Sequence, residues 1–100
     1  MDRKLVNEFV KAAADYGKSA YQYHLSLEEV DRQKSNLENL HRWLKKPETK
    51  RVTDARKRLR KEISETSERL KDKSVYSKML SRRVKRLEHA FENRVRRLVE

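Results

Sequence analysis

A dense run of cationic side chains is the first feature of this sequence that could do chemistry. The segment DARKRLRKEI, residues 54–63, contains Arg56, Lys57, Arg58, Arg60 and Lys61. Lys and Arg at this density bind phosphate oxygens, and such binding is salt-dependent and tolerant of base sequence because it releases counterions from the nucleic acid. The same side chains also form the solvated face of many long helices, where they pair with Glu four residues away.

Heptad spacing arranges these cations in stripes, because residues seven apart share one face of a helix. We predict a surface for nucleic acid or an acidic partner made of Lys50, Arg51, Lys57, Arg58, Lys61, Lys71, Lys78, Arg82, Lys85 and Arg86. The alternative is a solvated helix face on which the cations are neutralised at helical spacing by Glu62, Glu65, Glu68 and Asp72.

The charge of the whole chain is unevenly distributed. The net charge is +11, yet residues 1–44 hold seven cations and seven acids, whereas residues 45–100 hold twenty cations and nine acids. Such asymmetry between halves indicates a polyanionic partner. We therefore expect contact with nucleic acid, or with an acidic surface of a nucleic-acid-processing protein, by an accessory or regulatory factor.

No arrangement of residues predicts catalysis. The three histidines (His24, His41 and His89) are not at ligand spacing, and the chain has no Cys, no HExxH, no glycine-rich phosphate loop and no GxSxG. Glu28, Glu29 and Asp31 are close in sequence but point to different sides of a helix. We expect no enzymatic activity, no cofactor, no metal and no small-molecule ligand.

The aromatic residues lie mostly in the first half of the chain. Tyr16 and Tyr23 fit a packed core, whereas Trp43 and Tyr21 fall off the apolar period and are candidates for a protein interface. Because aromatic residues do not alternate with the basic run, the pattern does not favour a platform that stacks single-stranded bases.

Composition favours long helices that could position these side chains. Gly17 is the one glycine, Pro47 the one proline, and charged residues make up 43% of the chain, so too few turn formers exist for a multi-stranded fold. Steps of three and four in the first half predict an apolar seam through Val6, Phe9, Ala13, Tyr16, Ala20, Tyr23, Leu27, Val30, Lys34, Leu37, His41 and Leu44. The second half predicts one through Val52, Arg56, Leu59, Ile63, Thr66, Leu70, Lys73, Ser77, Leu80, Val84, Leu87, Phe91, Arg94 and Leu98.

The seams predict an all-α, single-domain, coiled-coil-like antiparallel hairpin. Because the residue before a proline avoids helical geometry, we expect a helix over about 2–45, a turn over about 46–49 and a second helix over about 50–99. The alternative is a break near 72–77, with Ser74 as the N-cap of a third helix.

Antiparallel pairing places Phe9 against Leu87 and Leu27 against Leu70, with Gly17 allowing a close approach of the helices. The apolar residues beyond the seam are too many for two helices alone, so we expect a homodimer or docking on a larger protein. A structural coiled-coil adaptor or dimerisation module without a nucleic-acid role is the alternative function. Lacking a signal peptide or a membrane span, the chain is expected to be soluble and intracellular, in the cytoplasm, the nucleoid or the nucleus.

Overall fold

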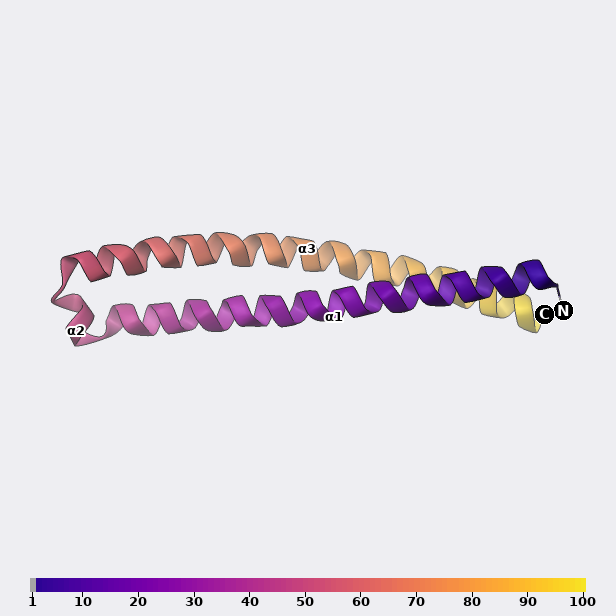
Figure 1. Cartoon of the computed structure of the whole chain (residues 1–100), viewed down its shortest axis with the longest axis horizontal. Coiled ribbons are helices and arrows are strands. Elements are labelled where there is room, and N and C mark those ends of the chain that lie inside the picture. The colour runs from indigo at the N-terminus through magenta and orange to yellow at the C-terminus, as the bar shows by residue number, and fades with distance from the viewer. Residues whose placement is uncertain (1) are drawn as a thin grey trace. The chain divides into compact units, whose positions relative to one another are not determined.

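The chain folds almost entirely into helices (Figure 1). A computed structural model describes residues 2–100. The helices are α1 (Arg3–Lys45), α2 (Pro47–Lys50) and α3 (Thr53–Val99), and no strand occurs among residues 2–100. The predicted all-α class is confirmed, and so is the contact between two long helices.

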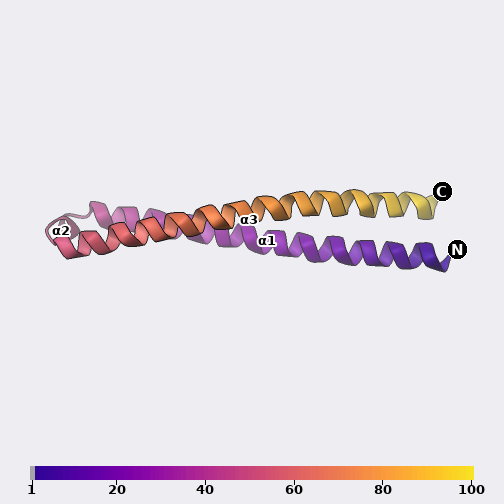
Figure 2. The same ribbon diagram turned by 90° about the horizontal axis from the view of Figure 1, so that it is seen from above.

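Contacts concentrate in two compact units. The hairpin unit is Leu27–Tyr76, which holds the end of α1, all of α2 and the start of α3. The terminal unit is the chain up to Ser26 together with Ser77–Glu100. Within each unit, a segment of α1 runs antiparallel to a segment of α3, as both ribbon views show (Figures 1 and 2).

The connection between the long helices is longer than the predicted turn. Lys46 has φ −66° and ψ 139°, the extended geometry expected before a proline, and Pro47 then begins α2 at a position where its missing N–H costs nothing. After α2, the Val52 N–H donates to the Thr49 carbonyl, and α3 begins at Thr53. The expected turn at 46–49 is therefore wrong in length, because the proline starts a separate helical turn.

Helix α3 is continuous through residues 72–77. The alternative of a third helix that begins after Ser74 is therefore wrong. The segment contains no Gly or Pro that would interrupt a helix, and Ser77 is 6% exposed, so this serine is packed and remains helical.

Burial along α3 follows the predicted seam closely. Two positions of that seam are exceptions: Val52 precedes the helix and is 51% exposed, and Lys73 is exposed within it. The other seam residues are buried or half-buried: Arg56, Leu59, Ile63, Thr66, Leu70, Ser77, Leu80, Val84, Leu87, Phe91, Arg94 and Leu98.

Along α1 one of the two predicted heptad series is displaced in the hairpin unit. The series through Val30, Leu37 and Leu44 is buried or half-buried, as predicted. In the other series the packed residues are Gln33 and Leu40, each one position before the predicted residue. The predicted Leu27, Lys34 and His41 are exposed. Burying the Lys34 ammonium without a partner would be costly, so the helix presents the neighbouring residues instead.

The most buried positions are mainly polar. Only Val30 and Leu80 are buried apolar residues among residues 2–100, against five buried polar ones: Ser19, Ser26, Gln33, Thr66 and Ser77. In the terminal unit the Ser26 hydroxyl donates to the Tyr23 carbonyl at 2.6 Å, and its Oγ lies 3.2 Å from the Ser77 Oγ. Buried hydroxyls with such partners avoid the cost of desolvation.

Aromatic contacts and an ion pair join the helices of the terminal unit. The Phe91 ring lies 5.4 Å from the Phe9 ring and 5.8 Å from the Tyr16 ring, between centroids. The Arg94 Nη1 donates to the Glu8 Oε2 at 2.9 Å. Phe9 therefore packs on Phe91 and not on Leu87, a displacement of about one helical turn. The longer connection explains the direction of the shift.

Gly17 does not lie at a close approach of the helices, contrary to expectation. It is exposed, and a Cβ atom added to it would meet no atom within 4 Å. Serine side chains at the buried positions of the seam are the small residues that allow the helices to approach.

Candidate nucleic-acid interface

The turn of the hairpin unit gathers cations from both long helices. Residues 42–61, which we call the basic tip, contain ten Lys or Arg but only two acids, Glu48 and Asp54. The end of α1, α2 and the start of α3 all contribute to the basic tip (Figure 1). Its ten cations are Arg42, Lys45, Lys46, Lys50, Arg51, Arg56, Lys57, Arg58, Arg60 and Lys61.

Only part of the basic tip was predicted from the sequence. Of the predicted binding residues, the hairpin unit holds six: Lys50, Arg51, Lys57, Arg58, Lys61 and Lys71. The terminal unit holds the other four: Lys78, Arg82, Lys85 and Arg86. Sequence reasoning noted Arg56 and Arg60 in the basic run but left them out of the predicted surface, and it missed Arg42, Lys45 and Lys46. The position of these three just before Pro47 was the signal that could have found them, since a turn brings its two flanks together.

All ten predicted cations are exposed and carry unneutralised charge. None of their side chains forms an ion pair or a hydrogen bond in the part of the chain that the structure describes. The solvated-face alternative requires these cations to pair with Glu62, Glu65, Glu68 and Asp72. No such pair is formed. The five predicted cations of the basic tip are therefore exposed, and their side chains are unpaired among the described residues: Lys50, Arg51, Lys57, Arg58 and Lys61.

Helix stability does not account for the cations at the start of α3. The N-terminus of a helix carries partial positive charge, so Arg56 in the first turn is unfavourable by roughly a few tenths of a kcal/mol, and Lys57 and Arg58 just beyond it gain nothing from the dipole. Arg56 is half-buried, and its Nε atom has no hydrogen-bond partner among residues 2–100. By contrast, Arg42 and Lys45 lie in the last turn of α1, where the helix dipole favours them.

Trp43 joins the basic tip from the last turns of α1. The residue is 54% exposed, and the Lys46 Nζ lies over the ring, 4.0 Å from the centroid. The indole thus contacts a cation of the connection and belongs to the same hairpin unit as the cations at the start of α3. Tyr21, the other predicted interface residue, is 62% exposed but belongs to the terminal unit. No contact of either residue with a partner is shown.

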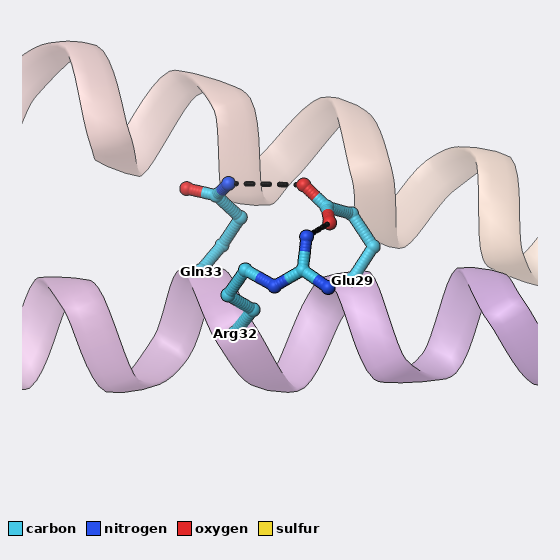
Figure 3. A network of polar contacts seen from close by, with 3 residues as sticks. All are labelled: Glu29, Arg32 and Gln33. Carbon is cyan, nitrogen blue, oxygen red and sulfur yellow. Dashed lines mark hydrogen bonds and ion pairs between the residues drawn. The ribbon is translucent and has the colours of Figure 1, made fainter.

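A carboxylate network lies farther along the hairpin unit (Figure 3). The Arg32 Nη1 donates to the Glu29 Oε2 at 2.7 Å, and the Gln33 Nε2 donates to the Oε1 at 3.1 Å. The pKa of Glu29 is lowered from its ordinary value of 4.5, first by the hydrogen bond from Gln33, against partial desolvation, and then by the charges of Arg32 and Lys73. Glu29 therefore remains an anion that holds local side chains.

The described residues offer neither a metal site nor a membrane span. No group of three His, Cys, Asp or Glu side chains placed to hold a metal occurs among residues 2–100. Over the same residues, neither long helix has an apolar stretch of the length that crosses a bilayer.

No protein-family model, curated protein or solved structure matches this chain.

Proposed function

We propose that this protein is a non-enzymatic binding protein whose basic second helix contacts nucleic acid, as an accessory or regulatory factor. An acidic surface of a nucleic-acid-processing protein is the alternative target of the same surface. One observation carries the proposal: ten cations and two acids gather at the basic tip, and the predicted binding cations there have no acidic partner.

Phosphate binding by the basic tip follows from ordinary electrostatics. Each Lys or Arg that neutralises a phosphate releases a condensed counterion, which favours association and makes it weaken as salt rises. The guanidinium groups of Arg51 and Arg58 can each bind two phosphate oxygens at once, whereas Lys57 and Lys61 act as point charges. No set of side chains for base-edge readout was identified, so we expect affinity with little sequence preference.

Charge reversal at the tip tests the proposal. In the variant Lys57→Glu, Arg58→Glu, Lys61→Glu, binding to a labelled oligonucleotide, measured by fluorescence anisotropy, should be abolished at moderate salt. All three side chains are exposed, so the helical circular dichroism should be preserved.

A matched control separates the tip from the net charge. The variant Arg3→Glu, Lys11→Glu, Lys18→Glu makes the same charge change on exposed residues of α1 that lie outside the predicted surface, in the terminal unit. It should weaken binding much less. Equal loss in both variants would show that net charge alone attracts the ligand, and unchanged binding in the tip variant would remove the assignment of this surface.

A dimerisation module is the second candidate, and the exposed area favours it. In the hairpin unit Leu27, Val75 and Tyr76 are 42%, 62% and 48% exposed. If a second copy covers them, light scattering coupled to size exclusion should show a dimer that Val75→Glu, Tyr76→Glu converts to a helical monomer.

A further inference from the structure

Trp43 is the feature of the basic tip that phosphate binding alone does not explain. It is the only tryptophan of the chain, and it is 54% exposed although the neighbouring Leu40 and Leu44 are half-buried on the seam. A phosphate oxygen can accept a hydrogen bond from the indole N–H, but it offers nothing to the face of the ring. A nucleobase does, because its flat face stacks on aromatic side chains.

The ring is occupied by a contact that a base can displace. The Lys46 Nζ lies 4.0 Å from the ring centroid. An exposed cation–π contact of this kind is worth about a 2- to 5-fold factor in an equilibrium constant, whereas stacking of one base is worth about a 5- to 150-fold factor. A base can therefore take the place of the ammonium group on the ring, and the released Lys46 is then beside the phosphate of the stacked nucleotide.

The strandedness of the ligand decides whether this exchange can occur. In a duplex the bases are paired and stacked on one another, and taking one out requires unpairing and unstacking. A single strand presents its bases at no such cost. Lys50 and Arg51 in the connection and Lys57 at the start of α3 are exposed cations of the same hairpin unit, available for the flanking phosphates.

We infer that the basic tip binds single-stranded nucleic acid in preference to duplex, with one unpaired base stacked on Trp43 in place of Lys46. This inference rests on the proposed nucleic-acid binding and names its ligand class. It revises the expectation, drawn from the sequence, that aromatic residues do not accompany the basic run. The fold places Trp43 from α1 and the cations of α3 in the same hairpin unit.

The intrinsic fluorescence of the single tryptophan tests the inference directly. Wild-type protein is titrated with a 12-nucleotide single strand and with the duplex of the same sequence, at equal salt. The single strand should quench Trp43 strongly and the duplex weakly. Unchanged fluorescence at saturation with the single strand would overturn the inference.

Substitution of the ring supplies the second measurement. Trp43→Ala should lower single-strand affinity about 5- to 150-fold and leave duplex affinity within about twofold, while Trp43→Phe should retain part of the preference because a smaller aromatic ring remains. Tyr21→Ala, which removes an exposed aromatic side chain of the terminal unit, should change neither affinity. Equal losses for both ligands, or none, would overturn the inference.

The outcomes distinguish the stacking inference from the proposed nucleic-acid binding on which it rests. If charge reversal at Lys57, Arg58 and Lys61 abolishes binding but Trp43→Ala does not affect it, the proposed function stands and the stacking inference fails. If the wild type binds no oligonucleotide at moderate salt, both fail. A blue shift of Trp43 with vesicles containing anionic phosphatidylserine, but not with the single strand, would assign the tip to a membrane surface and overturn both.

Discussion

Replacing Gly17 with alanine should stabilise the protein. Gly17 lies in the interior of α1, its φ is not positive, and an added Cβ would meet no atom within 4 Å. Alanine in a helix interior is favoured over glycine by about 0.8–1.0 kcal/mol, mainly because glycine loses more backbone entropy on folding. With no steric cost to subtract, almost the full difference should appear in the free energy of unfolding.

Thermal unfolding followed by circular dichroism measures the change. For a domain of this size, 1 kcal/mol shifts the midpoint by about 4–8 °C, so Gly17→Ala should raise the midpoint by roughly that amount. Ala14→Gly is the matched reverse change at another exposed position of α1 and should lower the midpoint by a similar amount.

A midpoint that falls in Gly17→Ala would refute the reasoning. It would mean that another surface touches the α carbon of Gly17 in solution. A fall that is also concentration-dependent would favour the dimerisation module over a monomer, since a dimer's stability depends on protomer concentration.

Two further predictions concern the polar groups that join the helices. Ser26→Ala and Ser77→Ala should each lower the free energy of unfolding in urea by about 0.5–1.5 kcal/mol. The double variant should lose less than the sum of the two, because the hydroxyls lie 3.2 Å apart in the buried seam. Strict additivity would show that the hydroxyls do not interact. Because the pKa of Glu29 is lowered from 4.5 in the folded chain, its contribution to stability is present above pH 4.5 and is lost as pH falls through the lowered value. Gln33→Ala should raise that pKa toward 4.5 in a carboxyl NMR titration, and a pKa that does not move would contradict the assigned cause.

The sequence predicted the seam of α3 better than that of α1. Along α3 the apolar residues recur so regularly that even polar positions such as Thr66 and Ser77 are buried as the period requires. Along α1 the choice between Gln33 and Lys34 for one seam position could not be made from spacing, since both series contain apolar residues. The cost of burying an ammonium decides for Gln33, and that cost depends on how the opposite helix packs.

The position of the turn at Pro47 was predicted correctly, but the length of the connection was not. Pro47 marks where α1 ends, yet the same proline is well suited to the first position of a new helix, and α2 follows it. This lengthened connection shifts the pairing, so that Phe9 meets Phe91 and not Leu87. A short sequence motif could not show how many residues the connection would use.

The candidate site was predicted in part. The uneven charge pointed to the second half of the chain, and Lys57 and Arg58 belong to the tip. Because charges were counted over residues 1–44 and 45–100, Arg42 was assigned to the neutral segment and Trp43 was separated from the cations. Only the folded chain shows that residues on both sides of Pro47 belong to one compact unit.

The salt dependence of binding tests the central claim most directly. The association constant of a labelled single strand is measured across a salt series for the wild type and for the variant Lys57→Gln, Arg58→Gln, Lys61→Gln. The account predicts tight binding at moderate salt and a steep linear fall of log K with log salt, with a slope about 2 smaller in the variant if all three residues contact phosphates. Wild-type binding that appears only at very low salt, with the same slope in the variant and no preference among single strand, duplex and RNA, would contradict it.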